Sequence, residues 1–153
     1  MFYILKCGKM GHPPTLRFAA HLLLQNKGKI LLQRRFNTGY SDGKYGLVSG
    51  HVEKGEKLKA AMKRESLEEA GIKIREKDME VVNVLHLIKE YEAVQVFLRV
   101  NKWQGKPTNM EPDKCDRLEW FPLDRLPSKM VPYVRYGLSQ IKKGNFYSEY
   151  VEK

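Results

Sequence analysis

The sequence has only two cysteines among 153 residues, Cys7 and Cys115, and they lie far apart in the chain. Small secreted proteins held together by disulfides are rich in cysteine, so this class is excluded. Two cysteines with His12 also do not make a zinc site. The low cysteine content suggests a reducing compartment, and we therefore expect a cytoplasmic protein with buried or idle thiols.

Long apolar runs are missing as well. The apolar stretch from Met1 to Leu5 is too short for a signal peptide, and no later stretch could span a membrane. No internal repeat, low-complexity tract or linker interrupts the chain. With 42% hydrophobic and 30% charged residues, the composition is typical of a globular protein. We expect one domain over residues 1–153, with residues 1–15 as an N-terminal extension and with no membrane partner.

Negative charge is scarce, because 28 lysines and arginines face only 18 acidic residues and the formal net charge is +10. A positive field draws anionic ligands toward a protein. A basic surface alone does not choose between a free nucleotide and the end of an RNA. The net charge therefore indicates an anionic partner but does not identify it.

One acidic cluster stands out, because Glu65, Glu68 and Glu69 fall within one turn of a predicted helix that ends at Gly71. Like charges three or four residues apart repel each other and weaken a helix. A bound cation would turn that repulsion into attraction. Hard cations such as Mg²⁺ take carboxylate oxygens together with substrate phosphates. The cluster therefore predicts a metal-assisted phosphate reaction.

The residues around this cluster keep a fixed spacing over residues 50–72. The fixed positions are Gly50, Glu56, Arg64, Glu65, Glu68, Glu69, Gly71 and the aliphatic Ile72. This pattern resembles the Nudix box, and its chance occurrence in a chain of this length is on the order of one in a million at ordinary residue frequencies. Ser66 departs from the pattern, because the family usually has an aliphatic residue there.

The resemblance extends beyond the box. Residues 34–45, 111–115 and 120–123 are similar to segments of a MutT-like group, so that most of residues 16–145 are covered. The resemblance implies an α/β fold, an α/β/α sandwich around a mixed β-sheet. It also implies hydrolysis of a nucleoside diphosphate linked to a further group, with Mg²⁺ or Mn²⁺. A nucleoside triphosphate, normal or oxidised, cut to nucleoside monophosphate and pyrophosphate is the leading expectation.

The resemblance further implies roles for the box residues. Glu65 and Glu69 are expected to be the principal metal ligands, with help from Glu68 and from the backbone carbonyl of Ser49. Glu56 and Arg64 are expected to hold the loop and the helix in register. A general base often comes from outside the box, and the spacing leaves Glu111, Asp113 and Asp116 open as candidates.

Candidates for substrate binding lie mainly before the box. Arg34, Arg35 and Lys44 are candidate phosphate contacts, for which a solvated basic surface is an equal alternative, and His51 is a weaker one. Phe36, Tyr40, Tyr45 and Trp103 are candidates for stacking a base, with ordinary packing as the alternative. Trp120 is more simply a core aromatic residue. Glu111 is included as a further substrate contact.

The apolar periodicity predicts the order of the elements. Strands are expected over residues 16–25, 30–35, 45–49, 79–88, 92–100 and 117–121, and helices from residue 56 or 57 to Gly71 and over 131–143. The first two strands and the 79–100 region form hairpins. In the box helix Leu58, Ala61 and Met62 share the side of the glutamates, and Leu67 lies on another flank, so we expect both sides to be covered.

Two alternative functions stay open at this point. The net charge of +10 allows an RNA 5′-end pyrophosphohydrolase. A nucleotide-binding regulator without enzyme activity is the other, although such proteins usually lose the box glutamates, which are all present here. A homodimer is compatible with the sequence, which does not decide the oligomeric state.

Overall fold

The computed structural model describes residues 15–153. The expectations for the N-terminal extension, for Cys7 and for His12 fall on residues 1–14 and lie outside this range. The elements are β1 (Arg17–Asn26), β2 (Lys29–Arg35), β3 (Tyr45–Gly46), β4 (Val48–His51), α1 (Leu58–Ala70), the 3₁₀ turn η1 (Glu76–Asp78), β5 (Met79–Ile88), β6 (Glu92–Val100), β7 (Cys115–Pro122), α2 (Pro132–Lys142) and β8 (Tyr147–Val151). In the described part of the chain no helix has the length and apolar character needed to cross a bilayer.

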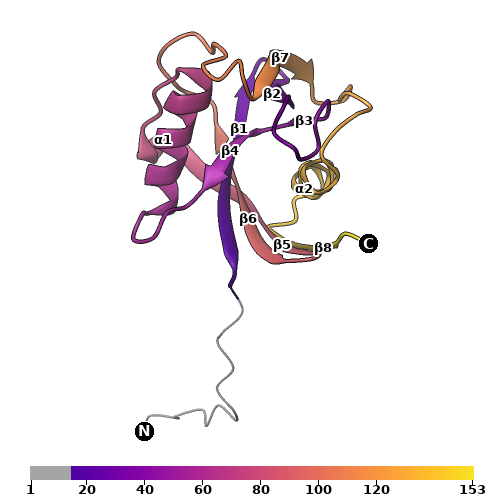
Figure 1. Ribbon diagram of the computed structural model, residues 1–153. Coiled ribbons are helices and arrows are strands. Elements are labelled where there is room, and N and C mark those ends of the chain that lie inside the picture. The colour runs from indigo at the N-terminus through magenta and orange to yellow at the C-terminus, as the bar shows by residue number, and fades with distance from the viewer. Residues whose placement is uncertain (1–14) are drawn as a thin grey trace, which may run out of the picture.

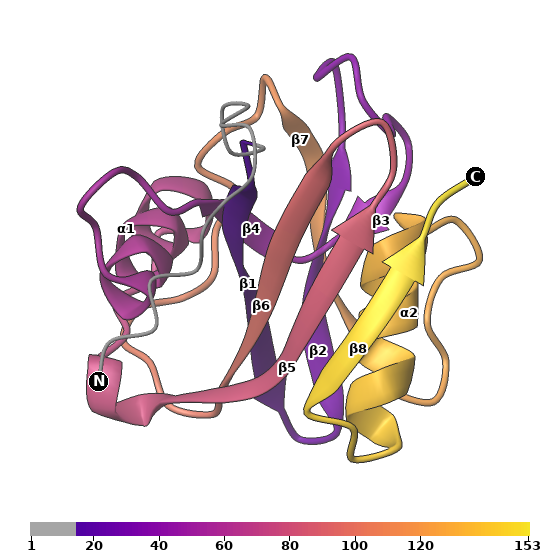
Figure 2. The same ribbon diagram turned by 90° about the horizontal axis from the view of Figure 1, so that it is seen from below.

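The strands form one mixed sheet in the order β3-β2-β1-β6-β5-β8, with β4 paired to β1 and β7 paired to β2. Strand β1 runs parallel to β6 and antiparallel to β4. Helices α1 and α2 lie on opposite sides of the sheet (Figures 1 and 2). The predicted α/β/α sandwich with a mixed sheet is confirmed.

The alternation of side chains along β1 builds two cores. Leu22 and Leu24 point into a cluster that includes Met62 of α1. Leu23 points to the opposite side and packs in a second cluster with Phe97 and Leu138. Burying each of these side chains stabilises the fold by about 1.5–3 kcal/mol. The two clusters fix both helices on the sheet.

Strand β4 carries the start of the box into the middle of the sheet. Its residues Val48–His51 pair with Ala19–Leu22 of β1, so that Ser49 lies opposite His21 and Gly50 opposite Ala20. The expected first hairpin is therefore short, with pairs only at Gln25↔Ile30 and Asn26↔Lys29. The rest of β1 pairs with other strands, which no local turn signal shows.

Helix α1 buries one narrow stripe, made of Ala61, Met62, Ser66 and Ala70. The expectation that Leu67 packs on a second flank was wrong, because its side chain is 48% exposed. Ser66 is fully buried where the family usually has an aliphatic residue. Its hydroxyl donates to the carbonyl of Met62 at 2.6 Å, so the buried polar group is satisfied within the helix.

Two elements were not predicted, the 3₁₀ turn η1 and strand β8. Strand β8 pairs in parallel with β5 at the edge of the sheet. Its side chains Tyr147 and Val151 are more than half exposed, so burial gives the segment little apolar signal. The strand expected over 45–49 is divided into β3 and β4, which pair with different partners.

Gly137 of α2 offers a test of the second core. A Cβ atom at this position would overlap the ring of Phe97. Gly137→Ala should gain up to about 1 kcal/mol from helix propensity but lose about 1–3 kcal/mol from overpacking. We expect a net loss in the free energy of unfolding, measured by urea denaturation. Lys142→Ala on the exposed side of the same helix should leave it nearly unchanged, and equal stabilities of the two variants would contradict the packing argument.

Candidate functional site

The site begins where Glu65 of α1 lies against the backbone of β4. The carboxylate occupies the space that a side chain at Gly50 would need, since a Cβ atom there would overlap it. The side chain of Glu65 is only 13% exposed. Glycine at position 50 is therefore required for the helix carboxylate to lie against the strand.

Glu69 is held one helical turn further on. Its Oε2 atom accepts hydrogen bonds from the backbone N–H of Ser49 at 3.0 Å and from the side-chain amide of Gln33 at 2.9 Å. Gln33 lies on β2, 36 residues away in sequence. No spacing rule in the sequence pointed to it, because only the pairing of the strands brings it to the helix.

Arg64 connects the box loop to the helix. Its Nε and Nη2 atoms donate to Glu56 at 3.0 and 2.9 Å. Its Nη1 atom donates to Glu65 at 2.6 Å and lies 3.4 Å from Glu68, and Nη2 also donates to the carbonyl of His51 at 3.1 Å. One guanidinium group thus contacts three carboxylates and the end of β4.

The pKa values of Glu65 and Glu69 are raised in the metal-free protein. Burial raises the pKa of Glu69 to about 7, and the charges of Glu65 and Glu111 add to the effect, while the two N–H donors oppose it. Burial also raises the pKa of Glu65, against the effect of Arg64. A cation placed between the carboxylates would favour their ionised forms.

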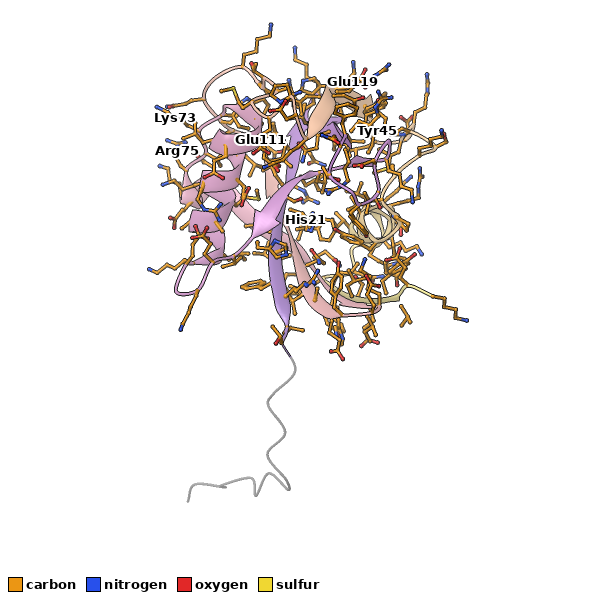
Figure 3. The ribbon with its side chains drawn as sticks, viewed as in Figure 1. His21, Tyr45, Lys73, Arg75, Glu111 and Glu119 are labelled. Atoms are coloured by element: carbon orange, nitrogen blue, oxygen red, sulfur yellow. The ribbon has the colours of Figure 1, made fainter. Side chains whose placement is uncertain are left out.

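Glu111 reaches this site from the loop before β7. Figure 3 shows it between α1 and β7, and its carboxylate pairs with Lys114 at 2.9 Å. Its charge acts on both Glu65 and Glu69. The other two candidates for a general base differ in position, because Asp116 is held by Arg34 and Asp113 is exposed.

The candidate metal ligands described above fit a hard divalent cation that takes only some of its ligands from the protein. Within residues 15–153 no group of three His, Cys, Asp or Glu side chains is gathered into a ready-made metal cage. Arg64 holds Glu65 and Glu68, while Ser49 and Gln33 hold Glu69. All the available donors are oxygens, and such sites are usually completed by substrate phosphates and water.

A cavity of about 500 Å³ has Ser49, Gly50 and His51 of β4 in its wall, the strand against which Glu65 and Glu69 also lie. Three tyrosines and three cations also line it, namely Tyr40, Tyr91, Tyr133, Arg17, Arg35 and Lys89. The volume lies within the range of about 300–1,000 Å³ that small-molecule sites occupy. Glu90 also lines the cavity, 3.6 Å from Lys89, so the lining offers aromatic surface and a net positive charge.

The cations and rings alternate along one side of the cavity. The guanidinium carbon of Arg17 lies 3.7 Å from the centroid of the Tyr91 ring, and Nζ of Lys89 lies 4.6 Å from Tyr91 and 4.5 Å from Tyr40. Arg35 lies 5.4 Å from Tyr40. The sequence analysis named Arg35 and Tyr40 but missed the other three residues, which come from β1 and the β5–β6 turn and belong to no local motif.

Several other candidates lie outside this cavity. Tyr45 is buried, and its hydroxyl donates to Glu119 at 2.5 Å; both residues are labelled in Figure 3. Arg34 forms two hydrogen bonds with Asp116 at 2.8 and 2.5 Å. Lys44 is partly buried but does not line the cavity.

The remaining aromatic candidates also have other positions. Trp103 and Trp120 stack on each other at 5.9 Å and pack against the core on the α1 side. Phe36 is 48% exposed.

Residues 14–140 match the model of the NUDIX domain family. The chain belongs to the Nudix hydrolase family. The resemblance drawn from the box and the expectation of an enzyme are therefore confirmed. Members of this family generally use divalent metal ions, which agrees with the oxygen-rich donor set described above.

Two curated relatives show the range of the family. The chain is 30% identical over 122 residues to an oxidized purine nucleoside triphosphate hydrolase of Danio rerio, which covers 74% of this chain and 70% of that protein. It is 24% identical over 129 residues to the NAD-capped RNA hydrolase NudC of Chromobacterium violaceum, which covers 82% of this chain but only 45% of that protein.

The fold also matches solved Nudix structures. The MutT NUDIX hydrolase of Burkholderia pseudomallei superposes with a TM-score of 0.76 at 29% identity, and the match covers 82% of this chain and 98% of that one. The MutT protein of Methanosarcina mazei superposes with a TM-score of 0.73 at 19% identity, which supports the fold alone. The fold of this Nudix hydrolase thus matches nearly the full length of both solved MutT structures.

The raised pKa of Glu69 predicts how the metal-free hydrolase responds to pH. The folded protein keeps a proton on Glu69 up to about pH 7, whereas an ordinary glutamate releases it near 4.5. The contribution of the protonated Glu69 to the free energy of unfolding is therefore fully present below about pH 4.5 and should be lost as the pH rises to about 7. Urea denaturation at a series of pH values in chelator measures this slope.

The carboxamide variant Glu69→Gln has no proton to lose, so its slope over this range should be smaller. Glu68→Gln is the matched control, because Glu68 is 53% exposed and should leave the slope in place. Identical slopes for wild type and Glu69→Gln would contradict the assignment of this proton.

Gly50→Ala tests the close approach of Glu65. The added methyl group should displace the carboxylate from β4, and a misplacement of about 1 Å can lower a rate by about 10²-fold. We expect such a loss in kcat with the fold retained by circular dichroism. Gly46→Ala is the control, because its Cβ atom would meet Val131 at an ordinary 3.6 Å. Full activity of Gly50→Ala would show that Glu65 does not need this position.

Proposed function

We propose that this Nudix hydrolase cleaves a nucleoside diphosphate linked to a further group, with Mg²⁺ or Mn²⁺ as the cofactor. A nucleoside triphosphate cut to nucleoside monophosphate and pyrophosphate is the leading substrate. One observation carries the proposal, namely that the buried carboxylates of Glu65 and Glu69 lie against β4, which also forms one wall of a cavity lined by tyrosines and cations.

In this proposal Glu65 and Glu69 hold the metal, Glu68 assists, and Ser49 offers its backbone carbonyl. The ion, when bound, would neutralise phosphate oxygens and lower the pKa of a water molecule. Arg64 keeps Glu65 against β4 through its contacts with Glu56 and His51.

Glu111 is the best placed of the three candidate bases. Its charge acts on both buried carboxylates, and its pairing with Lys114 leaves it 30% exposed and able to reach water. Asp116 is less suitable because Arg34 holds it in two hydrogen bonds.

The cavity supports a nucleotide as the substrate. The cations Arg17, Arg35 and Lys89 provide positive charge for an anionic ligand, and Tyr133 adds aromatic surface for a base. The similarity to an oxidized purine nucleoside triphosphate hydrolase supports a triphosphate. Such substrates are found free in the cytoplasm, which is the location we propose.

An RNA 5′ end is the second candidate substrate. The net charge of +10 and the similarity to an NAD-capped RNA hydrolase favour it. Binding to RNA longer than a nucleotide should then fall steeply with salt, because phosphate contacts release counterions. A shallow salt dependence, equal to that of a mononucleotide, would favour the nucleoside triphosphate.

The proposed function is tested with a panel of substrates in Mg²⁺ or Mn²⁺. The panel compares nucleoside triphosphates, nucleotide sugars, dinucleotides and triphosphorylated or capped RNA. Light scattering of the same sample measures whether the protein is a homodimer. Activity should vanish in excess chelator while circular dichroism shows the fold intact. In H₂¹⁸O the label should enter a phosphate product, and label on a carbon-linked hydroxyl would exclude attack on phosphorus.

Glu69→Gln separates catalysis from structure. Loss of a metal ligand should lower kcat by about 10²-fold or more. The free energy of unfolding without metal should hold or rise slightly, because the variant removes charge from a crowded, buried site. Thermal denaturation and steady-state kinetics on the same sample measure both. A less stable but fully active variant would mean that Glu69 serves the scaffold alone.

A further inference from the structure

Two buried polar side chains lie together on the sheet face that α2 covers. His21 of β1 is 2% exposed and Gln95 of β6 is 5% exposed. Their neighbours on this face are Leu23, Ala93 and Phe97, all buried in the second core. Burying polar groups among such neighbours costs free energy unless something is gained. Both residues line the cavity beside Gly50, which suggests where the gain lies.

The hydrogen bond between the two side chains has a defined donor and acceptor. Nε2 of His21 lies 2.6 Å from Oε1 of Gln95. An amide oxygen only accepts hydrogen bonds, so Nε2 carries the proton and donates it. Burial lowers the pKa of His21 to about 4, so the ring is neutral near pH 7 and Nδ1 bears a lone pair. The bond therefore fixes both the histidine tautomer and the rotation of the amide.

This arrangement is costly for the free protein. Nδ1 of His21 is buried without a hydrogen-bond partner in the described part of the chain. An unsatisfied buried acceptor costs more free energy than one ordinary hydrogen bond returns. A leucine at position 21 would avoid that cost on this apolar face. Stability alone therefore does not account for the histidine.

The histidine ring is also held rigidly. Phe97 stacks on it at 5.0 Å with an interplanar angle of 20°, and Tyr133 meets it edge-on at 5.9 Å. Gly137 lets α2 approach Phe97 closely and so supports this stack. Figure 3 shows His21 on β1, at the place where β1 pairs with β4. A rigid ring can hold the Gln95 amide in one orientation.

The consequence concerns the other half of the Gln95 amide. With Oε1 bound to His21, the NH₂ group is turned away from the ring on a residue that lines the cavity. An NH₂ group donates hydrogen bonds and accepts none. It would therefore recognise a ligand that presents an acceptor, such as a carbonyl oxygen or a ring nitrogen.

We propose that Gln95 determines base specificity by donating to an acceptor on the edge of the substrate's nucleobase, and that His21 is a positioning residue that fixes the Gln95 amide. The proposal rests on the proposed function, because it assigns the cavity to the nucleoside part of the substrate. It adds the residue that distinguishes one base from another.

Two measurements test the proposal. The first is kcat and KM for the four common nucleoside triphosphates and for ribose 5-triphosphate, which has no base. The second is calorimetric binding of the four nucleoside monophosphates. Gln95→Leu should raise KM for the preferred base about tenfold with little change in kcat, and should compress the differences between bases. Its activity on ribose 5-triphosphate should equal that of wild type.

The histidine variants separate positioning from packing. His21→Leu should reduce the base preference as Gln95→Leu does, while its melting temperature holds or rises. His21→Gln keeps a donor for Oε1 and should restore part of the preference. Gln140→Leu is the matched control, a buried glutamine on α2 whose loss should change stability but not base preference.

The outcomes distinguish this proposal from the proposed function. Hydrolysis of nucleotides with an unchanged base preference in Gln95→Leu would overturn the specificity proposal and leave the function intact. Binding of monophosphates with a preference that depends on Gln95, but without hydrolysis of any nucleotide, would support the specificity proposal and overturn the function. A wild type that neither binds nor cleaves nucleotides would overturn both.

Discussion

The site depends on the burial of two carboxylates of α1 against the backbone of β4. Glu65 fills the space that Gly50 leaves open, and Glu69 accepts the N–H of Ser49. Both groups give up water, and burial raises the pKa of both. The free protein therefore holds the contact between helix and strand at an electrostatic cost. In the proposed function a cation would turn this cost into binding affinity, so the same contact that weakens the fold would prepare the site.

Arg64 offsets part of the electrostatic cost of burying Glu65 when no metal is bound. It gives Glu65 a charged partner and uses Glu56 and the carbonyl of His51 to tie the box loop to the helix. Glu69 has only neutral donors, and its pKa reaches about 7 while Arg64 opposes the rise at Glu65. The two carboxylates thus differ in environment although they lie one turn apart. The less compensated one has more to gain from a divalent ion.

The local part of the site could be predicted from the sequence, and the non-local part could not. The spacing from Gly50 to Glu69 lies within one strand, one loop and one helix, and helical periodicity brings Glu65, Glu68 and Glu69 together. Gln33 reaches Glu69 through strand pairing, and Lys89 reaches Tyr40 across 49 residues. Leu67 was misjudged because apolar character does not reveal that small residues define the buried stripe of α1. Strand β8 was missed because its exposed side chains carry little pattern.

The cavity combines two opposite electrostatic demands. The overall charge of +10 and the cations Arg17, Arg35 and Lys89 favour an anionic ligand, whereas the carboxylates of Glu65 and Glu69 on the α1 side of β4 disfavour one. Alternation with tyrosine rings stabilises the close placement of the three cations. In the proposed function a polyphosphate that arrives with a divalent cation would satisfy both groups at once, since its charge would meet the cations while the ion would meet the carboxylates. Neither the anion nor the metal alone would be bound as well, so the geometry favours their joint binding.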